Sequence, residues 1–208
     1  MEQPTNFYVL VPANFFGKTL FMKLCIKYMV SSRCKDLVLT ELKKLGVQSQ
    51  YVMIDLGMVE ILETITKSQR RVLEENLRHS GLEVLDTRRT MLIDKIKDAI
   101  VEMIQSEHLP ATNYSDFLSK KLKHDYTYMA NMFSDVKGIT IQQFIIINKI
   151  EKVKELLMYD EYSLTEISNR MNYSSVAHLS HQFKKVTGLT PSFYKQIRQK
   201  RERSMSDV

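Results

Sequence analysis

A pattern of apolar residues and glycines occurs twice in the second half of the 208-residue chain. Leu118 and Ile167 are equivalent positions that lie 49 residues apart. Further along the two copies, Gly138 and Gly188 lie 50 residues apart, so the second copy has one additional residue before its glycine. A repeat that keeps its apolar and glycine positions while one turn changes length indicates a repeated structural unit. We therefore expect two copies of one small helical fold.

The second copy has the signals of two short helices joined by a tight turn. Ser163 followed by Glu166 is a capping box, which fixes the start of the first helix. The second helix is expected to open near Ser175 and to end at Gly188. Its buried face is predicted to contain Val176, Leu179, Phe183 and Val186. This is the helix-turn-helix layout, in which the second helix enters the major groove of DNA.

With these residues the chain from about Arg89 to Arg198 resembles the AraC/XylS family of bacterial transcription regulators. The resemblance rests on short matches to that family's second helix-turn-helix unit: Ile167-Ser168, Asn172-Tyr173, Phe183-Lys184-Lys185, Gly188-Leu189-Thr190-Pro191 and Tyr194. It implies an all-α DNA-binding domain over residues 89–200 with two helix-turn-helix units. It also implies a transcription regulator whose partner is double-stranded promoter or operator DNA.

A long helix is predicted to connect the two copies, from Thr140 to Met158, and in the family an amphipathic helix from Leu92 to Ile104 would open the domain. About 19 residues at about 1.5 Å each give a connecting rod of roughly 28 Å. Such a rod can hold two reading helices about one DNA turn apart, so one chain would cover two successive major-groove segments. The apolar positions of the rod are Phe144, Ile147, Ile150, Val153, Leu156 and Leu157.

The residues expected to contact DNA face away from the buried stripe of each second helix. In the first copy this helix is predicted from about Tyr126 to Val136, and its contact residues are Thr127, Tyr128 and Asn131. Asn131 can bind adenine bidentately, and Thr127 can touch a thymine methyl group. In the second copy the expected contact residues are Ser175, His178, Ser180, His181, Lys184 and Lys185.

Within the second copy, His181 and Ser180 are the leading candidates for contacts to base edges. Lys184 and Lys185 are expected to meet phosphate groups, as is the Ser175 hydroxyl at the helix N-terminus. Neither reading face carries an arginine, so the bidentate arginine–guanine contact is missing and the DNA site is expected to favour A·T pairs.

Other interpretations stay open for some of these side chains. His178 and His181 stand three residues apart and could form half of a metal site, although no cysteine or carboxylate is placed to complete it. Tyr126 and Tyr128 could equally cover the surface of the domain. We therefore predict no metal site.

The first half of the chain predicts a different architecture. Its elements are expected to be a strand over 22–28, a helix capped by Ser31 or Ser32, two strands over 51–56 and 58–62 joined around Gly57, a helix after the Thr66 and Gln69 capping box, and a strand over 82–85. The order βαββαβ over residues 21–88 indicates a ferredoxin-like sandwich, with helices on one face of an antiparallel sheet. The fold class is therefore α+β, and the all-α double helix-turn-helix domain follows.

The loop after the first strand resembles that of the heavy-metal-associated domain, whose M-x-C-x-x-C motif holds a soft ion between two thiolates. Here the loop reads Met29-Val30-Ser31-Ser32-Arg33-Cys34, so Ser31 takes the first cysteine position. A hydroxyl cannot replace a thiolate for a soft metal, and Cys34 is interpreted as a small apolar residue on the buried face of its helix. A soft-metal sensor is the alternative function. Ligand sensing by an unknown effector, protein contact and homodimer formation stay open as uses of this domain.

Composition agrees with a globular DNA-binding protein. The net charge of +6 suits an anionic partner, although charge alone is a weak indication. There is no glycine-rich phosphate loop and no combination of nucleophile, base and orienting group, so we expect neither an enzyme nor a cofactor.

The two ends of the chain are expected to lie outside these domains. Residues 1–20 are interpreted as a flexible extension, with Met22 as a hypothetical natural start. Residues 201–208 are interpreted as a basic tail, either solvated or attracted to phosphate. No stretch approaches the about 20 apolar residues of a membrane span, and no secretory signal is recognisable, so a cytoplasmic location is expected.

Overall fold

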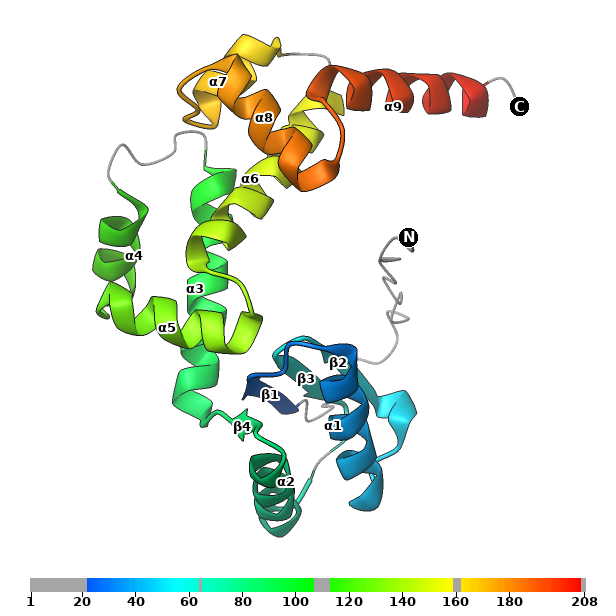
Figure 1. Cartoon of the computed structure of the whole chain (residues 1–208), viewed down its shortest axis with the longest axis vertical. Helices are drawn as coiled ribbons and strands as arrows, with labels where there is room; N and C mark the ends of the chain where they lie inside the picture. Colours follow the sequence, from blue (N-terminus) through cyan, green and yellow to red (C-terminus); the bar gives the residue numbers. More distant parts are fainter. Residues whose placement is uncertain (1–21, 64, 107–112, 159–161, 207–208) are drawn as a thin grey trace. The chain divides into compact units, whose positions relative to one another are not determined.

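The computed structural model describes residues 22–63, 65–106, 113–158 and 162–206. The chain divides into two compact units, one that ends at Leu85 and one that begins at Asp86 (Figure 1). The predicted extension over residues 1–20 lies outside the described residues, and so does the hypothesis of a start at Met22.

The N-terminal unit contains a four-stranded antiparallel sheet in the order β2-β3-β1-β4. Its elements are β1 (Met22–Lys27), α1 (Ser32–Lys44), the 3₁₀ turn η1 (Ser49–Tyr51), β2 (Val52–Asp55), β3 (Met58–Ile61), α2 (Lys67–His79) and β4 (Glu83–Val84). Apart from the 3₁₀ turn, this is the predicted order βαββαβ. In the central strand β1, Leu24 lies opposite Val59 of β3 and Ile26 lies opposite Val84 of β4.

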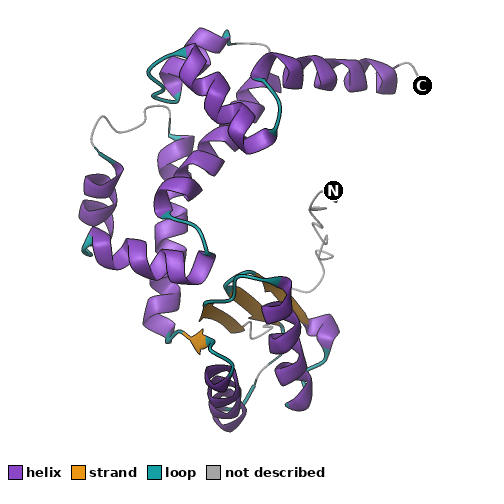
Figure 2. Ribbon diagram, in the orientation of Figure 1, coloured by secondary structure: helices purple, strands orange, loops and turns teal. Residues whose placement is uncertain are grey.

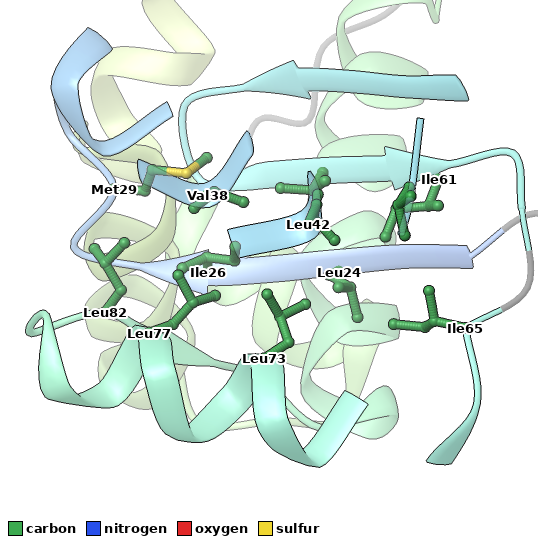
Figure 3. Packing of buried hydrophobic residues seen from close by; sticks show 12 residues of the cluster. Leu24, Ile26, Met29, Val38, Leu42, Ile61, Ile65, Leu73, Leu77 and Leu82 are labelled. Carbon is green, nitrogen blue, oxygen red and sulfur yellow. The ribbon is translucent and has the colours of Figure 1, made fainter. Parts of the chain in front are cut away.

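One apolar core joins this sheet to both helices. Leu24 and Ile26, two residues apart in β1, lie on the same face of the sheet and are fully buried. Figure 3 shows them against Leu42 of α1 and against Leu73 and Leu77 of α2. Both helices therefore cover the same face of the sheet, as the sequence predicts.

The strands are shorter than the sequence pattern predicts. β1 ends at Lys27 because Tyr28 has a φ of 65°, in the left-handed region that does not continue a strand. β2 begins only at Val52 because the preceding residues form the 3₁₀ turn. β4 contains only Glu83 and Val84. The predicted helix caps are observed, since the Ser31 hydroxyl caps α1 and Thr66 with Gln69 forms the capping box of α2.

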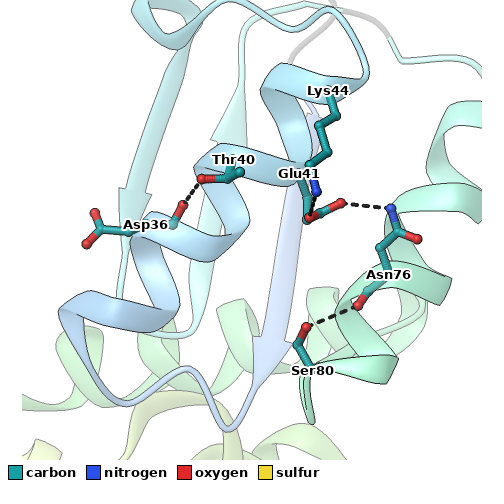
Figure 4. A network of polar contacts seen from close by, with 6 residues as sticks. All are labelled: Asp36, Thr40, Glu41, Lys44, Asn76 and Ser80. Carbon is teal, nitrogen blue, oxygen red and sulfur yellow. Dashed lines mark hydrogen bonds and ion pairs between the residues drawn. The ribbon is translucent and has the colours of Figure 1, made fainter.

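A buried carboxylate links the two helices of this unit (Figure 4). Lys44 Nζ donates to one oxygen of Glu41 at 2.7 Å, and Asn76 Nδ2 donates to the other oxygen at 2.7 Å. These two hydrogen bonds, that of Lys44 first, hold the pKa of Glu41 below its ordinary value. Glu41 is therefore expected to stay charged where α1 meets α2.

The described residues of the C-terminal unit form helices joined by loops and turns, without a strand (Figure 2). Its helices are α3 (Thr87–Gln105), α4 (Tyr114–Leu122), α5 (Tyr126–Lys137), α6 (Ile141–Met158), α7 (Leu164–Arg170), α8 (Val176–Thr187) and α9 (Pro191–Ser206). The long helix α6 packs against α3, α5, α8 and α9, which makes it the central element of the unit. None of the helices described has the length and apolar character that crossing a membrane requires.

Two boundaries of this unit differ from the prediction. The Asp86 carboxylate accepts the N–H of Arg89 at 2.9 Å and so caps α3, which places Arg88 and Arg89 in the first turn of a helix rather than between domains. At the other end α9 continues to Ser206, beyond the predicted domain end at residue 200, so residues 201–206 of the predicted basic tail are helical.

Two residues expected in the core are exposed. Val186 is 37% exposed because it lies in the last turn of α8, beyond the Leu179 and Phe183 contacts. Ile147 of α6 is 38% exposed, whereas Lys149, two residues later, is only 6% exposed. The buried stripe of α6 therefore passes through Ile145, Lys149 and Ile150.

Candidate nucleic-acid interface

The two copies of the repeat share the same aromatic support. In the first copy the ring of Phe133 in α5 lies 5.3 Å from that of Phe144 in α6. In the second copy Phe183 of α8 lies 5.5 Å from Tyr194 of α9 in an edge contact. Both phenylalanines are fully buried, and each pair fixes a second helix on the helix that follows it.

The second helix of each copy also ends in the same way. Gly138 and Gly188 have φ values of 67° and 78°, a left-handed conformation in which glycine has no Cβ penalty. Gly138 donates its N–H to the Ser134 carbonyl and Gly188 to the Lys184 carbonyl, both at 2.8 Å. The equivalent glycines of the sequence repeat are therefore equivalent C-caps.

The turn within each copy explains the change of offset from 49 to 50 residues. Lys123 and Asn172, 49 positions apart, both follow a first helix with positive φ, of 56° and 48°. Asp125 and Ser175, 50 positions apart, both cap a second helix through their side chains. The first turn has only His124 between these two positions, and the second has both Tyr173 and Ser174. The additional residue thus lies in the turn, as the sequence repeat indicates.

Helix α8, the second helix of the second copy, presents a polar and basic face. His181, Lys184 and Lys185 are exposed on α8, and Ser180 is half-buried. Leu179 and Phe183 occupy the opposite face and are fully buried. The residues predicted to read DNA therefore lie on the solvent side of α8.

The N-terminus of α8 is fixed by the turn that precedes it. The Ser175 hydroxyl oxygen accepts the N–H of His178 at 3.0 Å. The His178 ring bonds through Nδ1 to the Ser174 hydroxyl at 3.0 Å, and it stands edge-on to the Tyr173 ring at 5.2 Å. His178 is therefore exposed but held against the turn, which makes it a weaker candidate for a base contact than His181.

Helix α5, the second helix of the first copy, has a different surface. Thr127, Tyr128 and Asn131 are exposed on α5, so the three predicted contact residues share its solvent side. The Asp125 carboxylate caps this helix by accepting the N–H of Tyr128 at 2.8 Å. Tyr126 is half-buried, and burial raises the pKa of its hydroxyl. The exposed face of α5 carries neither histidine nor any of the cations present on α8.

A buried lysine of α6 lies between the two copies. Lys149 Nζ donates to the hydroxyl of Tyr114 in α4 at 3.4 Å, and it lies 4.2 Å from the ring centroid of Tyr173 in the second turn. Burial lowers the pKa of Lys149 to about 8 and raises that of Tyr173 to about 12. The ammonium thus connects the first helix of one copy to the turn of the other through a hydrogen bond and a cation–π contact.

No sequence pattern assigned a role to Lys149. Its only local signal is a charged residue directly before Ile150, within an apolar stretch of α6. A second residue missed is His124, which directly precedes the cap of α5 and is exposed. Its ring lies 6.3 Å from that of Tyr128.

The described residues contain no group of three or more histidine, cysteine, aspartate or glutamate side chains that could hold an ion. In the N-terminal unit Cys34 is half-buried, and its thiol lies 3.2 Å from the Ser31 hydroxyl. That hydrogen bond is the main reason why the pKa of Cys34 is lowered. The pair therefore combines one acidified thiol with one hydroxyl.

Among known protein families, one model matches the region of the repeat. Residues 118–197 match the family model described as a helix-turn-helix domain. The matched segment runs from α4 into α9 and so includes both copies of the repeat.

Similar proteins include bacterial transcription regulators. The chain is 24% identical over 101 residues to an uncharacterized HTH-type transcriptional regulator, YtdP, of Bacillus subtilis, covering 49% of this chain and 13% of that protein. It is 27% identical over 99 residues to the Msm operon regulatory protein of Streptococcus mutans, covering 47% of this chain and 35% of that protein. The chain therefore spans only a minor part of the length of these relatives.

A solved structure with a similar chain is the C-terminal domain of AraT, a response regulator from Geobacillus stearothermophilus. The similarity covers 53% of this chain and 88% of that chain, at 22% identity and a TM-score of 0.46.

Proposed function

We propose that this protein is a sequence-specific DNA-binding transcription regulator of the AraC type, in which α5 and α8 each enter a major groove. The observation that carries the proposal is the repeated helix-turn-helix frame over the segment that matches the helix-turn-helix family model. In such motifs the second helix contacts base edges with its N-terminal residues, while other residues hold the phosphate backbone.

The exposed residues of α8 divide into two roles. Ser180 and His181 lie in the N-terminal half of the helix, where the imidazole of His181 can contact a base edge. Lys184 and Lys185 lie in the last turn and carry full charges suited to phosphate. Ser175 uses its oxygen to cap the helix, so its hydroxyl hydrogen is the group that can be offered to a phosphate.

The exposed residues of α5 have no charge, and Asn131 and Thr127 are proposed to read bases. The carboxamide of Asn131 can pair with adenine, and the methyl group of Thr127 can contact thymine. Tyr128 lies in the first turn of α5, where its hydroxyl can reach the backbone. We accordingly expect the cations of α8 to hold its half-site and the neutral polar residues of α5 to hold the other half-site.

The length of α6 suits this arrangement. Its 18 residues correspond to about 27 Å, which is close to the roughly 34 Å between successive major-groove segments on one side of the duplex. Lys149, which contacts residues of both copies, would help to maintain their relative orientation.

The roles can be separated by substitution. His181→Ala should weaken binding to the specific site by about 1 to 3 kcal/mol and relax the preference at one base pair. Lys184→Ala should weaken binding to all sequences and lower the salt slope by about one. Lys43→Ala, an exposed lysine in the last turn of α1, is a charge-matched control that should change neither.

The test requires a DNA site selected from random sequence with the full chain, followed by titration of specific and random duplexes at several salt concentrations. Equal losses on both duplexes for His181→Ala and Lys184→Ala would refute the division of roles. Failure to select any sequence would refute the proposed function itself.

For the N-terminal unit we propose a ferredoxin-like fold without a soft-metal site. The order βαββαβ and two helices packed on one face of an antiparallel sheet support the fold. The Ser31 hydroxyl beside the Cys34 thiol supplies only one soft ligand, which disfavours Cu(I). Titration with Cu(I) should show no tight stoichiometric binding. Tight binding that Cys34→Ala abolishes would instead establish a metal sensor.

A further inference from the structure

A groove lies beside the first reading helix, between the start of α3 and the turn that precedes α5. Its volume is about 470 Å³, and its walls include Arg88, Arg89 and Lys95 of α3 together with His124 and Tyr128. We call it the α3 groove. We propose that the α3 groove binds backbone phosphates of DNA on the outer flank of the half-site read by α5. This inference rests on the proposed function and adds phosphate contacts from α3 to those proposed for the helix-turn-helix residues.

The charge of the groove is the first argument. Arg88, Arg89 and Lys95 are exposed and positively charged. One carboxylate lines the same groove, that of Asp86, which caps α3 and lies 3.5 Å from Arg89 Nε. Within the described part of the chain, neither Arg88 nor Lys95 has an ion-pair partner. The groove therefore keeps two cations for a ligand, and a phosphodiester is the anion that a DNA-binding protein meets.

The position of the groove is the second argument. His124 directly precedes Asp125, the cap of α5, and Tyr128 lies in the first turn of that helix with 45% of its surface exposed. In helix-turn-helix proteins the N-terminal residues of the second helix meet the base edges. The wall of the groove formed by His124 and Tyr128 is therefore the part of this copy that comes closest to DNA. Cations on the opposite wall would then lie near the adjacent backbone.

The third argument is that the exposed face of α5 has no counterpart to the lysines of α8. The exposed face of α8 carries Lys184 and Lys185, but the corresponding face of α5 carries Thr127, Tyr128 and Asn131. Half or more of the hydrogen bonds in protein–DNA complexes go to phosphate and sugar, and these contacts fix the register of the protein. The first copy needs such contacts from another element. α3 is a suitable source because its first turns line a groove with the start of α5.

The test uses the full chain and its selected DNA site, in three duplexes. One extends by about half a helical turn beyond both half-sites, and the other two are truncated at one end or the other. The double variant Arg88→Ala/Lys95→Ala should bind the extended duplex about tenfold to fiftyfold more weakly than the wild type, and its salt slope should fall by about two. On the duplex that lacks the flank next to the α5 half-site, the variant and the wild type should bind equally.

Lys97→Ala is the matched control, because Lys97 lies on the same helix but does not line the groove. It should bind all three duplexes like the wild type. Equal losses of the double variant on all duplexes, or no loss on any, would overturn the proposal. A loss that depends on the flank next to the α8 half-site would also overturn it. Failure of the proposed function is distinguishable, because the wild type would then select no site at all.

Discussion

The two helix-turn-helix copies have the same internal frame and different outer surfaces. The pairs Phe133–Phe144 and Phe183–Tyr194 hold each second helix at ring distances of 5.3 and 5.5 Å. On the outside, α8 carries histidines and lysines, whereas α5 carries Thr127, Tyr128 and Asn131. Under the proposed function, the internal frame would determine where each DNA-reading helix lies, and the outer surface would determine which bases it contacts. The duplicated unit therefore keeps its packing while the exposed residues of its two copies differ.

The largest expected effect tests whether the buried phenylalanines of the two copies contribute equally to stability. Phe133→Ala and Phe183→Ala should each lower the free energy of unfolding by about 3 to 5 kcal/mol, because both side chains are fully buried. Phe193→Ala, at a position that is 50% exposed, is the control and should change stability by less than about 0.5 kcal/mol. Urea unfolding of the three variants measures these changes in the free energy of unfolding. A cost confined to one of the buried positions would show that the frames are not equivalent.

A smaller effect concerns Lys149, which contacts residues of both copies. Lys149→Met should stabilise the protein at pH 7 by about 1 to 3 kcal/mol, because it removes a buried charge, although it also removes the contact with the Tyr173 ring. Binding to the two-half-site DNA should nevertheless weaken, since α4 and the second turn lose their common contact. A variant that is less stable at pH 7 would show that the cation–π contact outweighs the cost of burial.

The lowered pKa of Lys149 should also make the stability of the protein depend on pH. The pKa of Lys149 is about 8 in the folded protein, compared with about 10.4 for a lysine in an unfolded chain. Between these values the unfolded chain holds a proton that the folded chain has released, so the Lys149 contribution to stability rises with pH. The advantage of Lys149→Met should therefore shrink from pH 7 to pH 9.5. Unfolding of both proteins at the two pH values checks this, and a constant difference would contradict it.

The smallest effect concerns a detail in which the copies differ. Ser163 forms a capping box with Glu166 at the start of α7, but Asn113, at the start of α4, makes no hydrogen bond from its side chain to the helix. Ser163→Ala should cost about 1 kcal/mol, whereas Asn113→Ala should cost only a few tenths. Thermal unfolding of the two variants distinguishes these values. Equal costs would remove this distinction between the copies.

The parts of the structure that local chemistry determines were predictable from the sequence. Gly138 and Gly188 end helices because they adopt positive φ, and the capping boxes of Ser163 and Thr66 start helices as expected. Periodicity also identified the buried faces, with Leu179 and Phe183 inside.

Features that depend on contacts between distant elements could not be predicted. Lys149 is buried because Tyr114 and Tyr173 converge on it from two different copies of the repeat. The α3 groove forms because the start of α3 lies against the turn before α5, and in the sequence Arg88 and Arg89 indicate only a domain boundary. Such contacts join residues that are far apart in the sequence, so no local sequence pattern predicts them.

The central claim is that α5 and α8 read two separate half-sites. Every base pair of the selected DNA site should be substituted in turn, and the binding of the wild type, Asn131→Ala and His181→Ala should be measured on each duplex. We expect Asn131→Ala to lose the preference at a position in one half-site. His181→Ala should lose it at a position about one helical turn away. Loss of preference at the same position in both variants, or at none, would contradict the account.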